Sequence, residues 1–334
     1  MSEAAVDRIL LLSEILGQDH VVAMLRHGLE RKTLHHALLF VGPEGVGKRS
    51  AAVGLAARLL CERRGAEACG ACAACIQVRA GSHPDLRREG FFYDVKRKEA
   101  RDHTLIDQVR GVQLFLGGQA LGGGSKIVIF EEAQALTEDA QNALLKTLEE
   151  PPRGSVLVLV CHNASRLLPT VLSRCQRVAF APLERATVET ILRDRLHVSA
   201  DDALFLSVYS EGSVVLAADV KRLREAHVRA ADLLAACAGG YADVVRAVRE
   251  ASLSTPRGLP LELKMVLLLL RRHLRAQAGV EDAAELTPAS KTATLVGALH
   301  AAEAAYAAVV DFGRNANRAL AAERMALRIG DSLR

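Results

Sequence analysis

The stretch from Gly42 to Ser50 constrains the fold of this chain more than any other. It follows the apolar run Ala37–Val41 and precedes an Ala/Leu-rich segment that reaches Leu60. A glycine-rich loop between a strand and a helix is typical of phosphate-binding sites, because its backbone N–H groups and a lysine can surround phosphate oxygens. The candidate nucleotide-binding residues in this loop are Gly42, Pro43, Glu44, Gly45, Val46, Gly47, Lys48, Arg49 and Ser50.

The loop departs from the usual pattern where magnesium should bind. Arg49 stands where the motif has a Ser or Thr hydroxyl, and Ser50 cannot replace it because one residue along a helix rotates the side chain by about 100°. A second apolar run, Lys126–Phe130, ends in Glu131 and Glu132, although the first acid is normally Asp. We therefore expect ATP or ADP binding with weakened magnesium coordination. The alternatives are that the glycine-rich turn binds no ligand, and that Glu131 and Glu132 are solvated acids in a loop after a strand.

Further elements alternate along the chain in the order that a parallel sheet requires. Ser155–Cys161 is an apolar run with little alternation, as expected for a strand covered on both faces, and residues 178–180 are a fourth candidate strand. A helix is predicted over Glu138–Glu149, ending at Pro151 and Pro152 because proline cannot continue a helix. Residues 88–103 are crowded with charge and are predicted to form an exposed connection.

No strand candidate follows Pro182. Helices are predicted over Thr187–Leu196, Asp201–Tyr209 and Val214–Ala226, and the chain then continues as Ala/Leu-rich helix. We therefore predict an α/β domain over residues 1–181, a small helical domain over 182–225 and an all-α domain over 226–334.

Four of the seven cysteines lie close together in the sequence, with the spacing C-x7-C-x2-C-x2-C. Four thiolates suit a tetrahedral zinc ion and leave no open position, so the predicted site is structural rather than catalytic. The predicted ligands, in a module over about residues 61–75, are Cys61, Cys69, Cys72 and Cys75. A chance cluster of buried thiols is the alternative, and Cys161, Cys175 and Cys237 are interpreted as small core residues.

Charge and hydropathy bear on nucleic-acid binding and on membrane insertion. A formal net charge of +4 is too small to indicate nucleic-acid binding by itself, and no apolar run approaches the roughly 18 residues of a membrane span. We expect a cytoplasmic protein with no membrane partner. Arg174 follows the segment 167–172, and chemistry alone favours a solvated surface residue over a group that acts on a neighbour's phosphate.

Two blocks resemble the bacterial clamp-loader ATPase family of DNA polymerase III. Residues 143–152, Ala-Leu-Leu-Lys-Thr-Leu-Glu-Glu-Pro-Pro, match a block typical of its subunits, and Ser173-Arg174-Cys175 is similar to their arginine-finger motif. The resemblance implies an AAA-type P-loop domain with a zinc module, a helical lid and a helical collar that joins a ring. It also implies that Arg174 projects into the ATP site of an adjacent subunit, and that His162 or Asn163 senses phosphate.

The departures from the family pattern point to its non-motor, stator-like members. Arg49 and Glu131 weaken the magnesium site, and Val215 stands where the motor subunits carry a lid arginine. The resemblance then implies gamma/tau and delta subunits as ring partners, sliding clamp and primer-template DNA as partners of the ring, and little ATPase activity of the chain's own. The alternatives are an ATP-hydrolysing gamma/tau-type motor and a zinc-stabilised DNA-binding adaptor that acts without a ring.

Overall fold

The computed structural model describes residues 10–63, 65–90, 93–94, 99–100, 106–122, 124–215, 220–237, 261–277 and parts of the segment 297–332. The chain divides into two compact units, residues 1–218 and 219–334. The predicted P-loop lies in the first unit, which is built around a sheet.

The first unit contains a five-stranded sheet in which every neighbouring pair is parallel. Its spatial order is β2 (Leu86–Glu89), β5 (Lys126–Phe130), β6 (Ser155–Cys161), β1 (Ala37–Val41) and β7 (Gln176–Ala179). All residues of β1 and β6 are buried, because helices cover both faces and no position of these strands meets water. The parallel sheet and the three apolar strands are confirmed.

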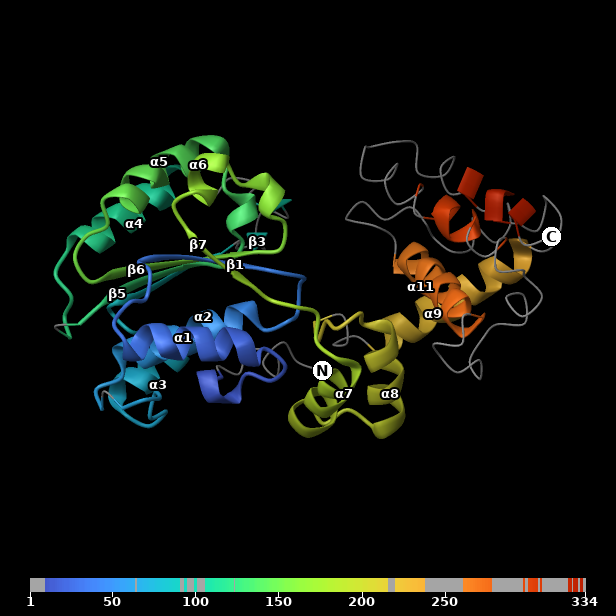
Figure 1. The fold of residues 1–334 in the computed structure, drawn as a ribbon, viewed down its shortest axis with the longest axis horizontal. Helices are drawn as coiled ribbons and strands as arrows, with labels where there is room; N and C mark the ends of the chain where they lie inside the picture. The colour runs from blue at the N-terminus through green and yellow to red at the C-terminus, as the bar shows by residue number, and fades with distance from the viewer. Residues whose placement is uncertain are drawn as a thin grey trace. The chain divides into compact units, whose positions relative to one another are not determined.

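Helices form a layer on each face of this sheet (Figure 1). The first layer contains α1 (Asp19–Glu30), α2 (Lys48–Leu60) and α3 (Ala73–Arg79), and the second contains α4 (Ile106–Gly117), α5 (Glu138–Glu149) and α6 (Pro169–Leu172). The Thr137 side chain accepts a hydrogen bond from the Ala140 amide, 3.3 Å away, and so caps α5. The predicted bounds of α5 are confirmed.

The prediction of an exposed connection over residues 88–103 is wrong at its start. Arg88 and Glu89 belong to the edge strand β2, where Glu89 is only 8% exposed and pairs with Arg87. Residues Tyr93–Asp94 (β3) and Glu99–Ala100 (β4) form a two-stranded antiparallel sheet. The other residues from 91 to 105 lie outside the described ones.

Helices follow the sheet within the first unit. They are α7 (Arg185–Thr190), a π-helical turn over Ile191–Arg195 (η5), and α8 (Ala200–Tyr209). The predicted start of the next helix at Val214 is wrong, because Val214 lies in a turn and its amide hydrogen-bonds outside any helix. Residues 216–219 lie outside the described ones.

In the second unit, α9 (Val220–Cys237) packs against α11 (Leu261–Gln277). The two helices bury Leu233, Leu234, Met265, Val266 and Leu270, so apolar helical faces hold this unit together, as the Ala/Leu-rich sequence predicts. Helix α9 is continuous across residues 225 and 226, between which a domain boundary is predicted from the sequence. Most of the remaining predicted helix, and the side chain of Cys237, lie outside the described residues.

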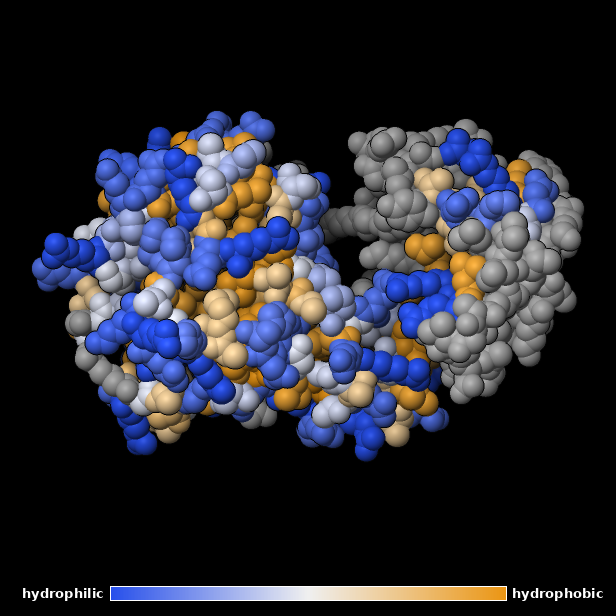
Figure 2. Space-filling view, viewed as in Figure 1, coloured by the Kyte–Doolittle hydropathy of each residue, from blue (hydrophilic) through white to orange (hydrophobic). Residues whose placement is uncertain are grey.

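The surface of the first unit is largely hydrophilic on the face drawn in Figure 2, with hydrophobic residues gathered at the level of the sheet. Among the residues that the structure describes, no helix has the length and apolarity that crossing a membrane requires.

Candidate nucleotide and metal sites

The glycine-rich loop has the conformation that its sequence predicts. Gly45 and Gly47 have φ angles of 72° and 96°, which L-residues rarely adopt, and α2 begins at Lys48 directly after them. The Lys48 ammonium donates hydrogen bonds to the carbonyl oxygens of Gly42, at 2.7 Å, and of Pro43. Burial lowers the pKa of Lys48, while the nearby Glu44 carboxylate opposes that change. The Lys48 ammonium group therefore lies inside the loop, held by the loop's own carbonyl groups.

A cavity of about 490 Å³ opens beside this loop. One part is apolar and is lined by Leu10, Ile15, Leu16, Leu183, Ile191 and Leu196. The other part is polar and contains the loop, including Gly45 to Ser50, together with Glu131 and Glu132. An apolar region joined to a few convergent polar groups is the usual form of a small-molecule site. The arrangement suits a nucleotide, with its base in the apolar part and its phosphates at the loop.

The residues at the expected magnesium position do not fit that ion. The Glu131 carboxylate accepts hydrogen bonds from Nε and Nη2 of Arg88, each 2.6 Å from Oε1, and Arg49 Nε lies 3.2 Å from Oε2. Magnesium needs near-octahedral oxygen ligands at about 2.1 Å. Here two guanidinium groups already surround the carboxylate that should ligate it. Arg88 therefore adds a third cause of weakened magnesium coordination to Arg49 and Glu131, and sequence reasoning missed it.

His162 directly follows the last residue of β6 and lies beside the glycine-rich loop. Its Nδ1 lies 3.4 Å from Oε1 of Glu44, and its backbone amide donates to the Gln134 side chain at 3.3 Å. His162 and Gln134 both line the cavity, whereas the Asn163 side chain accepts from the Ser165 amide and caps a short 3-10 turn. Of the two candidates for a phosphate-sensing residue, the structure brings only His162 to the cavity wall.

Gln18 connects the loop to the start of the helices that follow the sheet. Its side chain is fully buried, donates to the carbonyl oxygens of Val46 (3.3 Å) and Ala181 (2.7 Å), and accepts from the Ala181 amide. The Val214 amide adds a further link, donating to the Gly45 carbonyl at 3.0 Å. Ala181 and Val214, which lie on either side of α7 and α8 in the chain, are thus hydrogen-bonded to Gln18 and to the loop. No short motif in the sequence marks Gln18.

Replacing Gln18 by alanine is expected to reduce the free energy of unfolding by about 2 kcal/mol, because buried backbone groups at Val46 and Ala181 lose their partner. Chemical denaturation monitored by circular dichroism measures this change. Gln77→Ala is the matched control, since Gln77 is exposed on α3. Equal stability of the two variants would contradict the bridging role.

Val215 lines the cavity and is 51% exposed, so the position where motor subunits carry arginine offers no cation here. A different arginine, Arg195, reaches the cavity wall from the π-helical turn, and its Nη2 donates to the Glu14 carbonyl at 2.6 Å. Arg195 carried no signal in the sequence, because neither its neighbours nor its spacing form a motif.

Arg174 lies away from this cavity, just after α6. Its guanidinium donates to Oε1 of Glu149, from Nε at 2.8 Å, and to the Thr170 carbonyl at 2.9 Å. The Arg174 side chain is 35% exposed and Glu149 is 49% exposed, so this ion pair contributes little to stability. The structure therefore presents Arg174 at the surface, in contact with the last residue of α5.

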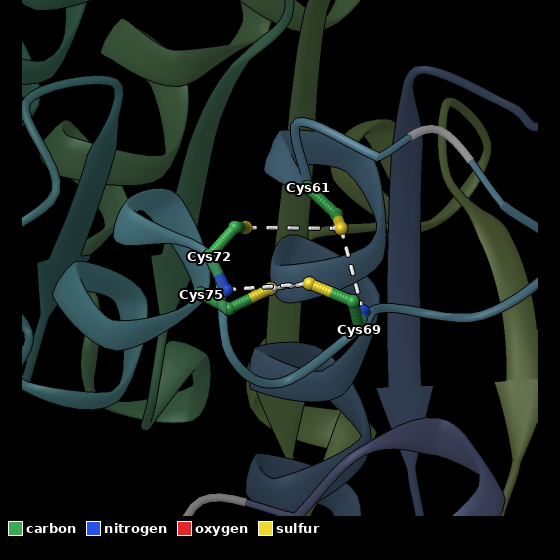
Figure 3. A group of neighbouring side chains, drawn as sticks. All are labelled: Cys61, Cys69, Cys72 and Cys75. Atoms are coloured by element: carbon green, nitrogen blue, oxygen red, sulfur yellow. Dashed lines mark hydrogen bonds between the residues drawn. The ribbon is translucent and has the colours of Figure 1, made fainter.

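The four clustered cysteines converge as their spacing predicts (Figure 3). Cys61 follows α2, and Cys72 and Cys75 lie at the start of α3. The sulfur atoms lie within 4.8 Å of one another, with 3.9 Å between Cys61 and Cys72 and 4.0 Å between Cys69 and Cys75. Zinc bonded to sulfur at about 2.3 Å requires sulfur separations of about 3.8 Å. The cluster thus fits a tetrahedral metal ion.

Local electrostatics differ among these thiols when no metal neutralises them. Backbone amides of Ala71 and Cys72 lower the pKa of Cys69 to about 6, and burial raises the pKa of Cys75 to about 12. Outside the cluster, Cys161 is buried and Cys175 is half-buried against the core. The Cys69 thiol therefore ionises at a lower pH than the Cys75 thiol.

Comparisons with known proteins agree on one family. A family model described as "DNA polymerase III, delta subunit" matches residues 17–184, half of the chain. DNA polymerase III subunit delta' of Pseudomonas aeruginosa is 44% identical over 160 residues, which cover 47% of this chain and 47% of that protein. The delta' subunit of Bacillus subtilis is 35% identical over 175 residues, covering 52% of this chain and 50% of that protein.

A related subunit type is also similar to the chain. DNA polymerase III subunit tau of Bacillus subtilis is 34% identical over 180 residues, which cover 54% of this chain and 30% of that protein. The delta' proteins thus share the higher identity. The chain spans about half the length of the curated delta' relatives it matches.

Proposed function

Because the chain belongs to the family described as DNA polymerase III, delta subunit, we propose that it is a delta-prime-type, non-motor subunit of the clamp loader. In this role it forms part of a ring with gamma/tau and delta subunits in the cytoplasm. The ring places a sliding clamp on primer-template DNA. The higher identity of the delta' relatives supports this subunit type over the gamma/tau motor.

We propose that Arg174 serves as an arginine finger for the ATP site of a neighbouring subunit. The observation that carries this proposal is the place of Arg174, which is half-buried at the surface, with its side chain 35% exposed, and does not line the chain's own cavity. A guanidinium directed at a transferring phosphoryl group stabilises its developing charge and can act across a subunit boundary. Breaking the exposed contact with Glu149 costs little, so Arg174 is available to a neighbour.

The chain's own cavity supports a holding role rather than a hydrolytic one. Arg49 supplies no oxygen ligand, Glu131 is already paired with two arginines, and Val215 provides no lid cation. Phosphoryl transfer depends on the exact positions of metal and water, so these replacements act together against turnover. The motor alternative requires the groups that this cavity lacks.

Steady-state ATP hydrolysis by the isolated chain separates the two candidates. We expect turnover below about 10⁻² s⁻¹, with no decrease in Lys48→Ala, because the hydroxyl and the aspartate that would position magnesium are replaced by Arg49 and Glu131. A gamma/tau subunit assayed in the same buffer is the positive control. Rapid hydrolysis that Lys48→Ala abolishes would assign the chain to the motor type.

We propose that zinc binds Cys61, Cys69, Cys72 and Cys75 and has a structural role. The support is the sulfur geometry and the set of four thiolates, which leaves no open position for substrate. The metal would supply a cross-link between the end of α2 and the start of α3. We also propose that residues 182–225 form the lid and residues 226–334 the collar.

A further inference from the structure

We propose that the cavity in the first unit binds nucleoside polyphosphate without a divalent cation, with Arg49 and Arg88 supplying the positive charge that magnesium normally provides. The proposal concerns the chain's own site and not the action of Arg174 on a neighbour. It therefore goes beyond the proposed function.

The first argument is geometric. Arg88 contacts one oxygen of the Glu131 carboxylate through two nitrogens, and Arg49 lies beside the other oxygen. All three side chains line the cavity together with Lys48. The two arginines therefore occupy the region beside Glu131 where a metal ion would otherwise bind, at the phosphate end of the cavity.

The second argument is the rigidity of this arrangement. Arg88 lies on β2, paired with Ile129 of β5, and the Glu131 amide donates to the Glu89 carbonyl at 2.8 Å. Arg88 is 22% exposed and Glu131 is 16% exposed. The backbone ladder thus holds the guanidinium beside the carboxylate, unlike a surface ion pair between two long side chains.

The third argument is charge. An ordinary P-loop site combines a divalent cation and a lysine with one aspartate. Here Arg49, Arg88 and Lys48 stand beside Glu131, so these four side chains alone have the same formal charge, +2, with no ion present. Magnesium would have to approach two guanidinium groups to reach this carboxylate, so its binding is opposed by like charge as well as by the missing hydroxyl.

The fourth argument concerns the ligand. Guanidinium groups bind phosphate through planar, paired N–H donors, and each carries five donors. The loop amides, Lys48 and two arginines can therefore hold a di- or triphosphate, while the apolar part of the cavity takes the base. Inorganic phosphate alone would leave the apolar part unfilled, and so we expect it to bind more weakly than ATP or ADP.

Isothermal titration calorimetry of the full chain with ATP, in EDTA and then in excess magnesium, tests the proposal. We expect ATP to bind at least as tightly in EDTA as in excess magnesium, because the site takes the magnesium-free nucleotide and magnesium in solution competes by chelating ATP. Inorganic phosphate is titrated in parallel to test whether the apolar part contributes. Binding that requires magnesium would overturn the proposal, as would the absence of binding in both buffers.

Two variants are expected to change the affinity for ATP in opposite directions. Arg88→Gln should weaken ATP binding in EDTA about tenfold, because one charged hydrogen-bonding group is lost. Glu131→Gln should tighten it, because both guanidinium groups are released toward phosphate, whereas a magnesium site would be weakened by the same change. Weaker binding by Glu131→Gln in EDTA would therefore contradict the proposal.

One further variant serves as a control and another as a substitute for Arg88→Gln. Arg110→Gln removes an arginine that is also paired with an acid, Asp107, but lies on α4 outside the cavity wall; we expect unchanged ATP binding. If Arg88→Gln fails to fold, Arg49→Gln replaces it, since Arg49 is 49% exposed. An empty cavity would overturn this inference alone, because the action of Arg174 is measured separately in the assembled loader.

Discussion

Replacing Arg174 by alanine is expected to slow ATP hydrolysis at the neighbouring site about a thousandfold, while the ring still assembles. An arginine finger supplied from another subunit accounts for roughly this factor in phosphoryl transfer, because its charge acts mainly in the transition state. The measurement is ATP turnover by a reconstituted loader in the presence of sliding clamp and primer-template DNA. Size-exclusion chromatography of the same sample reports assembly.

Three variants make this test specific. Arg174→Lys keeps the charge but loses the planar fork, so only partial activity should remain. Glu149→Gln removes the acid that contacts Arg174 in the isolated chain and should leave much of the activity. Arg177→Ala removes an exposed arginine on β7 and should have no effect. Unchanged turnover in an assembled Arg174→Ala loader would show that the finger comes from elsewhere.

Removal of the metal from the cysteine cluster is expected to have the largest effect on stability. Structural zinc contributes about 10 kcal/mol in small zinc-dependent peptides, and we expect a smaller loss here because α2 also packs against the sheet. Elemental analysis of the purified chain should find about one zinc ion per chain. Chelation or Cys75→Ser should then lower the melting temperature and expose α3 to limited proteolysis.

The control for this prediction is Cys175→Ser. Cys175 is half-buried and lies outside the cluster, so the zinc content of this variant should match that of the unaltered chain. A full complement of zinc in Cys75→Ser, or no zinc in the unaltered chain isolated without chelators, would contradict the assigned ligands.

The strands β1, β5 and β6 could be predicted from the sequence because each is buried on both faces and is therefore a nearly uninterrupted apolar run. Strand β2 could not, because it lies at the edge of the sheet and carries Arg87, Arg88 and Glu89. A high density of charged residues indicates a solvent-exposed segment only when those charges have no partners in the fold. Here Arg87 pairs with Glu89, and Arg88 pairs with Glu131, 43 residues away.

The candidate site was predictable where chemistry depends on local spacing. The glycine-rich loop and the four cysteines are contiguous motifs, and the structure brings each set together. Gln18, Arg88 and Arg195 reach the site from segments that are distant in the chain. Their roles depend on hydrogen-bond partners far away in the sequence, which no short pattern encodes.

The order of strands in the sheet has a consequence for synthesis of the chain. β1 is complete at Val41, but both of its neighbours, β6 and β7, come after residue 154. At about 5–20 residues per second, the ribosome needs roughly 6–24 s to supply the first partner. During that interval both edges of an entirely apolar strand lack their native partners, a condition that favours aggregation. We therefore expect the nascent chain to need chaperone protection until β6 emerges.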